Sequence, residues 1–122
     1  MIITLPWPHR DLNPNSRVHH LQKARHRRAQ REHAHILTRV AMLAYPFCRP
    51  GKTDGPVSVT YEFFAPSKRR FDVDNLYSSM KGAQDGMCEA LGFDDYRIEP
   101  TLKRGAPDKE NPRVEVVIGG EG

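Results

Sequence analysis

Hydrophobic and polar residues repeat along the chain in two ways, which together predict one small sheet covered by helices. Alternation of apolar and polar residues predicts strands at residues 2–5, 57–64 and 113–118, and a further strand at residues 96–102. Apolar residues that recur every three or four positions predict helices at residues 17–45 and 75–91. The predicted fold class is therefore α+β, a small mixed sheet with two principal helices packed on it, in the order β-α-β-α-β-β. The last two strands flank a turn at residues 105–112 and can form a hairpin.

Local signals set the predicted ends of these elements. Pro6 and Pro8 stop the first strand, because proline has no amide hydrogen to donate to a neighbouring strand. Ser16 is the expected N-terminal cap of the first helix, and Asp74 that of the second. Gly92 is placed to end the second helix in a left-handed conformation.

The same periodicity predicts which side chains face the core. Two glycines, Gly82 and Gly86, weaken the second helix by up to about 1 kcal/mol each unless they allow close packing. The residues expected to face inward are Val18, Leu21, Ile36, Leu37, Val40 and Leu43 on the first helix, Leu76, Met80, Ala83, Met87 and Leu91 on the second, and Val114, Val116 and Ile118 on the last strand.

Length and composition fit one domain, residues 1–122, that buries roughly two-thirds of the surface of its unfolded chain. No apolar run approaches the roughly 18 residues of a membrane span, so none is expected. The first six residues lack the basic and apolar regions of a secretion signal, which leads us to expect a cytoplasmic protein. Cys48 and Cys88 are far apart and lack ligand spacing, which argues against a disulfide framework and a structural zinc site.

The net charge of +4 and the isoelectric point near 9.3 favour a polyanionic partner, foremost nucleic acid. Much of this charge falls on the first predicted helix, where Glu32 is the one opposing acid in its basic half, and five of the six histidines lie there too. A solvated helix face is one interpretation, but like charges at helical spacing repel one another and are better tolerated against phosphate. Metal binding by the helix histidines is the weakest option, because none has H-x-x-x-H spacing. The basic residues are Arg17, Lys23, Arg25, Arg27, Arg28, Arg31 and Arg39.

A basic run directly precedes two acids at residues 68–74, and a second acidic pair follows at residues 94–95. On an extended segment Asp72 and Asp74 point to the same side, so both could bind one cation. Magnesium prefers oxygen ligands, with a few carboxylates completed by water and substrate phosphate. Two acidic clusters beside a basic run therefore suit metal-assisted phosphodiester chemistry, whereas a turn or a helix cap is the structural alternative for D-x-D-N.

Three segments together resemble the RusA-like endodeoxyribonucleases, small Holliday-junction resolvases often found in phages and prophages. They are Ile-Thr-Leu-Pro-Trp-Pro at residues 3–8, Arg-Arg-x-Asp-x-Asp-Asn-Leu at residues 69–76 and Gly-Phe-Asp-Asp at residues 92–95, and the resemblance spans most of the chain. It implies a homodimeric nuclease of DNA recombination and repair that uses Mg²⁺ or Mn²⁺ to cut four-way junctions by paired nicks. By position it assigns Asp72, Asp74 and Asp95 as the catalytic, metal-binding acids, with Asp94 as a neighbour, and Lys81 as the catalytic lysine.

Lys81 departs from the better-known pattern, in which the lysine stands four residues after the second aspartate, where this chain has Ser78. A three-residue insertion restores the spacing of the family between the lysine and an acid, here Asp85. The alternative role for Lys81 is an ordinary i, i+4 ion pair with Asp85. Trp7, between two prolines, is expected in the core or a dimer contact rather than under a DNA base.

In this interpretation basic side chains hold the DNA arms by their phosphates, which positions DNA without reading its sequence. A non-catalytic DNA-binding protein, such as a phage regulator, is the rival; a phosphohydrolase of small substrates is disfavoured by the basic excess. No glycine-rich phosphate loop is present, so no nucleotide cofactor is expected. The residues assigned to DNA binding are Lys68, Arg69, Arg70, Lys23, Arg27, Arg28 and Arg31.

Overall fold

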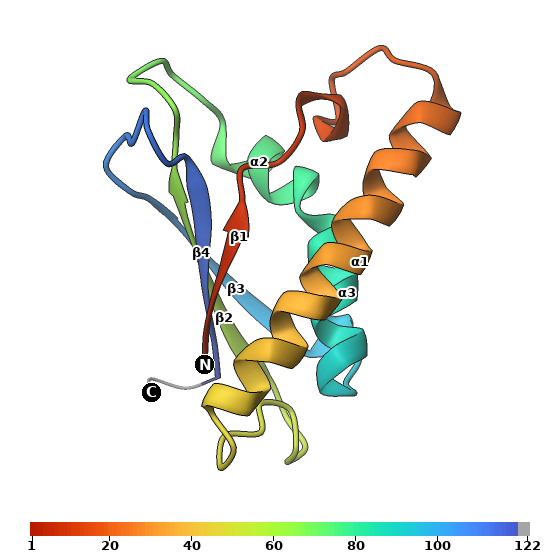
Figure 1. Ribbon diagram of the computed structural model, residues 1–122, viewed down its shortest axis with the longest axis vertical. Helices are drawn as coiled ribbons and strands as arrows, with labels where there is room; N and C mark the ends of the chain where they lie inside the picture. The colour runs from red at the N-terminus through yellow and green to blue at the C-terminus, as the bar shows by residue number, and fades with distance from the viewer. Residues whose placement is uncertain (120–122) are drawn as a thin grey trace.

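Four strands and three α-helices form an α+β fold in the computed structural model, which describes residues 1–119 (Figure 1). The predicted fold class is confirmed. No helix in these residues is long and apolar enough to cross a bilayer. The strands are β1 (Ile2–Pro6), β2 (Val57–Phe64), β3 (Ile98–Arg104) and β4 (Arg113–Ile118). The helices are α1 (His20–Ala44), α2 (Val73–Ser79) and α3 (Lys81–Leu91), with short 3-10 turns η1 (Arg10–Leu12) and η2 (Asp95–Arg97).

The strand order in the sheet is β1-β4-β2-β3. Strand β4 lies between β1 and β2 and is antiparallel to both, with Val114 opposite Leu5 and Val116 opposite Tyr61. Strand β3 lies at the edge, parallel to β2. The predicted hairpin of the last two strands is therefore wrong. The chain returns from β2 through α2 and α3, and such a helical crossover places the next strand parallel to the first.

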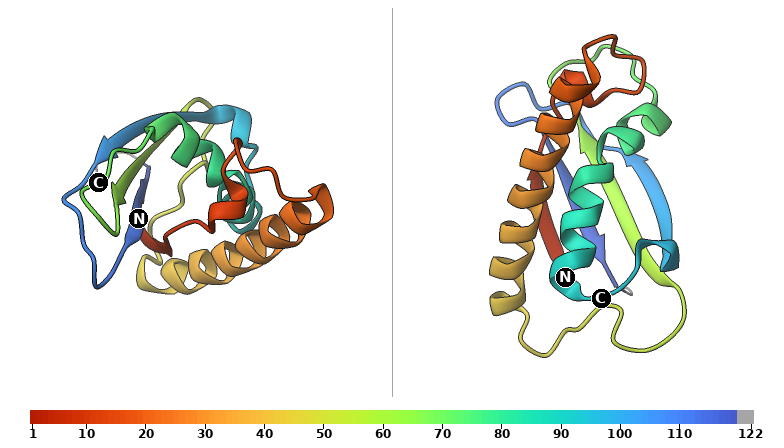
Figure 2. Two further views of the ribbon diagram at one scale, coloured as in Figure 1. Left: turned by 90° about the horizontal axis from the view of Figure 1, so that it is seen from above. Right: turned by 90° about the vertical axis from the view of Figure 1, so that its right-hand side faces the viewer.

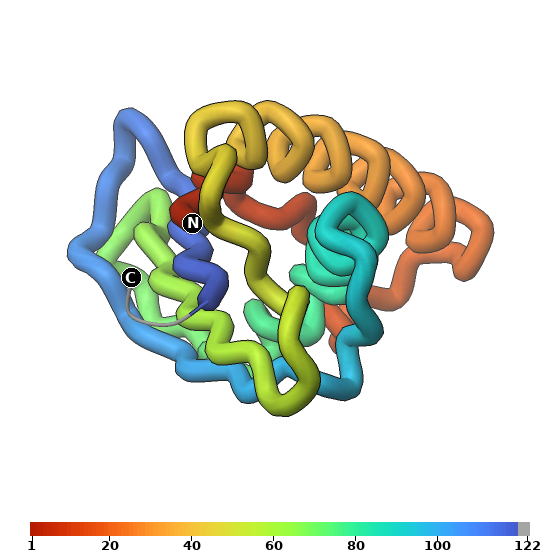
Figure 3. Tube along the Cα trace, turned by 90° about the horizontal axis from the view of Figure 1, so that it is seen from below, coloured from red at the N-terminus to blue at the C-terminus, as the bar shows by residue number. Residues whose placement is uncertain are grey.

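The helices α1 and α3 lie side by side over one face of the sheet (Figure 2). Residues alternate along β1, β2 and β4 between this buried face and a more exposed one, as the sequence pattern predicts for a sheet covered on one side. Seen from below, β1 begins next to the end of β4, where the Met1 ammonium group donates to the Ile118 carbonyl over 3.1 Å (Figure 3). The most deeply buried strand residues are Ile3, Leu5, Val59, Tyr61, Phe63, Val114, Val116 and Ile118, which confirms the three predicted on β4.

The backbones of α1 and α3 approach each other closely at two glycines. A Cβ atom on Gly86 would collide with the Arg31 carbonyl, and one on Gly82 would lie 2.8 Å from the Arg27 carbonyl oxygen. These glycines therefore allow the close packing that was the condition for them to be tolerated in this helix.

This close approach also decides which face of α1 is buried. Small side chains fit between two helices in contact, and Ala34 and Thr38 are the buried residues of α1. Of the α1 residues predicted to face the core, Leu37 is half-buried against it. The prediction is wrong for four others, which are exposed because the opposite face carries the helix contact: Leu21, Ile36, Val40 and Leu43.

The first turn of α1 differs from its prediction. The Ser16 hydroxyl accepts from the Val18 amide over 3.4 Å and closes a turn rather than capping the helix. The helix begins at His20, and the cap is His19, whose Nδ1 accepts from the Leu21 amide over 3.2 Å. An imidazole acceptor therefore replaces the predicted hydroxyl.

The second predicted helix is broken at Met80, whose φ of −98° and ψ of 8° separate α2 from α3. The Gln30 side chain of α1 spans the break: its Nε2 donates to the Ser79 carbonyl over 3.0 Å, and its Oε1 accepts from the Ala83 amide over 3.1 Å. A break leaves backbone groups without helical partners, and one amide side chain here satisfies a donor and an acceptor. The predicted apolar stripe is still buried at Leu76, Met80, Ala83 and Met87.

Candidate functional site

Asp72 and Asp74 lie together at the start of α2. Asp72 is the cap residue, and its Oδ1 accepts from the amides of Asp74 over 2.8 Å and Asn75 over 3.4 Å. The prediction that Asp74 caps the helix is wrong, because α2 begins at Val73 and Asp74 belongs to its first turn. Contrary to expectation, the two carboxylates therefore do not share one side of an extended segment. Both carboxylates are exposed, and Asp72 Oδ2 takes no part in the cap.

Arg104 of β3 holds the residue directly before this acidic turn. Its Nη1 donates to the Phe71 carbonyl over 2.7 Å, and its guanidinium lies over the Phe71 ring, 4.7 Å from the centroid. Trp7 contacts the Phe71 ring edge to face at 6.1 Å and Phe63 at 6.4 Å, which places Trp7 at the edge of the core, as expected. No sequence pattern identified Arg104, because its partner is a backbone carbonyl far away along the chain.

Lys81, the first residue of α3, faces Asp95 of η2. Its Nζ lies 3.9 Å from Asp95 Oδ2, and within residues 1–119 this ion pair takes the place of the alternative pair with Asp85. Lys81 and Asp85 both belong to α3, so their i, i+4 spacing is intact, yet the lysine reaches Asp95 instead. Both side chains are about half exposed, so the pair contributes little stability and remains accessible to a ligand.

The charge of Asp95 affects the pKa of groups on the adjoining helices α2 and α3. Burial raises the pKa of the Tyr77 hydroxyl, and the Asp95 carboxylate raises it further. Burial raises the pKa of the Cys88 thiol to about 12, and the negative charge of Asp95 is the next largest cause of this rise. Tyr77 and Tyr61 both donate to Gln84 Oε1, over 2.9 and 2.8 Å, which fixes α3 to α2 and to the sheet. The contact with Lys81, the first residue of α3, places Asp95 beside the junction of α2 and α3.

The structure gathers the candidate acids into two parts rather than one. Asp72 and Asp74 share the start of α2, whereas Asp95 lies with Lys81. Within the part of the chain that the structure describes, one group of three histidine, cysteine or acidic side chains has ligand atoms all within 4.8 Å of one another, and it is not these aspartates. That group is His9, Asp11 and His26, and spacing within the helix does not predict it, because two of its members come from the segment after β1.

The basic residues lie at the end of the molecule where α2 begins. Lys68, Arg69 and Arg70 are exposed on the loop between β2 and α2, and the N-terminal half of α1 lies at the same end (Figures 1 and 2). Arg27 and Arg28 are exposed as well, while Lys23 is half-buried. The basic loop and the basic half of α1 therefore lie at the same end of the molecule as the acidic turn.

Arg31 differs from the other basic residues of α1 because it pairs with Glu89 of α3. A hydrogen bond and the positive charge of Arg31 lower the pKa of the Glu89 carboxyl. Glu32 is the one acid in the basic half of α1 itself, and the sequence pattern does not reveal that Glu89 of α3 faces this helix. Arg31 thus has a structural partner that competes with phosphate.

Comparison with known proteins identifies a relative without a described activity. The chain is 34% identical over 99 residues to an uncharacterized protein of Xylella fastidiosa. The match covers 79% of this chain and 61% of the relative, so the chain spans about three-fifths of that protein's length. No protein-family model matches the sequence.

Proposed function

We propose that this protein is a magnesium-dependent endodeoxyribonuclease that cuts four-way DNA junctions by paired nicks, in DNA recombination and repair in the cytoplasm. The observation that carries the proposal is the contact between Lys81 and Asp95. This contact joins a lysine and an acid that the RusA-like pattern assigns to catalysis. Lys81 makes it although another acid, Asp85, lies one helical turn away on the same helix.

The residues present fit a hard divalent cation. Asp72, Asp74 and Asp95 offer carboxylate oxygens, and a magnesium ion is commonly held by one or two carboxylates plus water and substrate phosphate. Asp72 and Asp74 can therefore hold the ion without a closed three-acid cluster, through oxygens that the cap leaves free. Bound there, magnesium or manganese would lower the pKa of a water molecule and polarise the scissile phosphate.

The neighbouring side chains would place the DNA. Lys68, Arg69 and Arg70 precede the acids and would bind phosphates on one side, and the exposed arginines of α1 would do so on the other. Lys81 would place positive charge near the phosphate, where charge develops in the transition state. Arg104 would keep the acidic turn in position through Phe71.

A second copy of the chain would supply the second active site that paired nicks require. Ile36, Val40 and Leu43 are exposed at i, i+4 and i+7 on the outer face of α1. A stripe of this kind is complementary to itself under the twofold symmetry of a dimer. Val40→Glu should therefore shift a dimer toward monomer in light scattering, with Arg39→Glu on the same turn as the control for added charge.

The nuclease proposal is tested by Asp72→Asn, Asp74→Asn and Asp95→Asn, which keep the shape and remove the charge that holds a hard cation. Each variant should fail to cut a labelled four-way junction in magnesium while still binding it in EDTA. Asp85→Asn on α3 is the matched control and should cut normally. Cleavage at the wild-type rate by two of the three variants would contradict the proposal.

A non-catalytic DNA-binding protein is the second candidate, because Asp72 already has a structural task as the cap of α2. Asparagine caps a helix about as well as aspartate, so in this case the variants change neither folding nor function. The same gel separates the candidates. A wild-type protein that binds junctions but never cuts them with magnesium or manganese would support the binding protein.

A further inference from the structure

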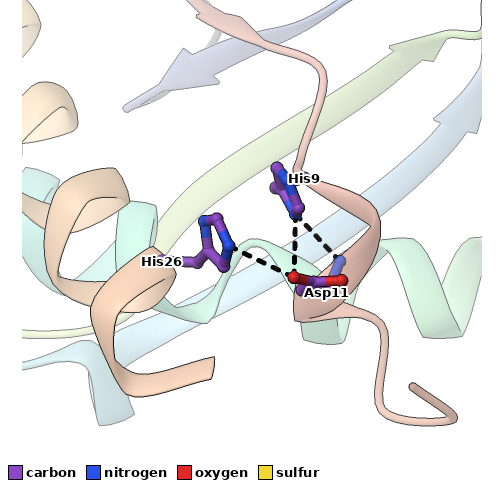
Figure 4. A group of neighbouring side chains, drawn as sticks. All are labelled: His9, Asp11 and His26. Atoms are coloured by element: carbon purple, nitrogen blue, oxygen red, sulfur yellow. Dashed lines mark hydrogen bonds and ion pairs between the residues drawn. The ribbon is translucent and has the colours of Figure 1, made fainter. Parts of the chain in front are cut away.

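We propose that His9, Asp11 and His26 form a binding site for one divalent transition metal ion of the zinc class, separate from the acids discussed above. His9 and Asp11 come from the segment after β1, and His26 comes from the basic half of α1 (Figure 4). Two imidazoles and one carboxylate form a donor set that zinc, cobalt and nickel prefer and magnesium does not. The proposal stands whether or not the protein is a nuclease.

The spacing of the ligand atoms is close to that of a tetrahedral site. Asp11 Oδ2 lies 3.2 Å from His26 Nε2 and 3.7 Å from His9 Nδ1. Ligand bonds of about 2.0–2.1 Å at tetrahedral angles place neighbouring ligand atoms roughly 3.3–3.4 Å apart. The ligand atoms are therefore near tetrahedral spacing, and rotation of the two imidazole rings would bring the three atoms around one ion.

Asp11 is a buried carboxylate, 6% exposed, in need of a positive partner. Its ion-pair partners in the described residues are the two histidines, and no lysine or arginine reaches it. Gln22 Nε2 donates to Oδ2 over 2.9 Å, which orients the carboxylate but adds no charge. Burial of an ionised acid is costly without a compensating cation, and a metal ion supplies one.

The two histidine rings are close neighbours, and sharing one cation requires them to rotate out of their stack so that a nitrogen of each points to the ion. Their rings are stacked, with centroids 3.8 Å apart and an angle of 16° between the planes. Two imidazolium rings at this separation repel each other, whereas two neutral imidazoles can bind the same metal ion. Coordination by His9 Nδ1 exchanges the hydrogen bond that this atom accepts from the Asp11 amide over 3.0 Å for a metal bond.

A cavity of about 210 Å³ adjoins the site, and its lining includes His9 and His26 together with Trp7 and His33. Three protein ligands leave one tetrahedral position open, and a water molecule in this cavity can occupy it. The metal ion would link η1 to the first turns of α1. It would thereby fix the basic half of the helix relative to the sheet.

The test is metal binding by the purified protein, followed by thermal unfolding and by the visible spectrum with Co²⁺. Zn²⁺ at a hundredfold excess over its dissociation constant should raise the melting temperature by about 10 °C, while Mg²⁺ should not. Co²⁺ should give the intense absorption of a tetrahedral site, with one equivalent bound. Removal of Zn²⁺ by a chelator should reverse the shift.

Variants of the ligands locate the ion. His26→Ala, Asp11→Asn and His9→Ala should each weaken Zn²⁺ binding by about a hundredfold or more, and Gln22→Ala by roughly tenfold as the residue that orients the carboxylate. His20→Ala, an exposed histidine at the start of α1 that does not line this cavity, is the matched control and should bind as the wild type does. His9 is exposed, so His9→Ala keeps the test valid if the Asp11 variant does not fold. The proposal is overturned if wild-type protein shows no tetrahedral Co²⁺ spectrum, or if His9→Ala and His20→Ala bind Zn²⁺ equally well.

Discussion

Replacement of Gln30 by alanine tests how the break between α2 and α3 is held. The side chain donates to Ser79 and accepts from Ala83, and both partners are backbone groups that the broken helix cannot satisfy. Gln30→Ala removes both hydrogen bonds at once and leaves a carbonyl and an amide without these partners. Lys81 lies between the two contacted residues, so the same change loosens the backbone that presents Lys81 to Asp95.

The expected loss follows from these two contacts. A hydrogen bond contributes about 1 kcal/mol net, and a buried group left unpaired costs about 1–3 kcal/mol. The site is partly buried, so water can restore some of the loss. Alanine also has a slightly better helix propensity than glutamine, which returns a few tenths of a kcal/mol. The net destabilisation should therefore be about 2 kcal/mol.

Urea unfolding followed by circular dichroism measures this difference. The midpoint should fall while the slope stays constant, as for a loss of stability without a change in exposed surface. Arg28→Ala, an exposed residue of the same helix, is the matched control and should change stability by less than about 0.5 kcal/mol. If Gln30→Ala is no less stable than this control, Gln30 does not hold the break.

Four further predictions, three on variants and one on the unaltered protein, have defined outcomes. Gly86→Ala should destabilise the fold by about 1–2 kcal/mol in thermal unfolding, because overpacking against α1 outweighs the gain in helix propensity; unchanged stability would contradict the close helix contact. Lys81→Ala should cost less than about 1 kcal/mol of stability but about a hundredfold in junction turnover, and a fall of less than about threefold would exclude a catalytic role. The double change of Arg27 and Arg28 to alanine should reduce the log-log salt slope of DNA binding by about 1.8, and an unchanged slope would mean that neither contacts phosphate. At pH 8 Cys88 should react with iodoacetamide far more slowly than the other cysteine, since its raised pKa keeps the thiol protonated; equal rates would show that it is accessible and ionised.

The periodicity of the sequence predicted the elements that bury a regular stripe or face. Strands β2 and β4 are where alternation placed them, and Gly92 ends α3 with a φ of 82°. These features depend on neighbours along the chain or on one covered face. The local sequence pattern is therefore sufficient to predict these strands and this helix end.

Features that depend on distant partners could not be predicted in this way. The buried face of α1 is set by the glycines of α3, so the large apolar residues at positions 36, 40 and 43 were assigned to the wrong side. The break at Met80 depends on Gln30, and the pairing of β4 depends on where the helical crossover places β3. For the candidate site, the sequence predicted which residues carry charge, while the partners of Asp72, Lys81 and Arg31 became visible only in the structure.

Cleavage of a four-way junction with labelled arms tests the central claim most directly. Wild-type protein should cut the junction, but not a duplex of the same sequence, in magnesium and not in EDTA. The two nicks should lie at symmetric positions on opposite strands, because a twofold dimer brings one active site to each. A protein that binds the junction and leaves all four strands intact in both magnesium and manganese would contradict the account.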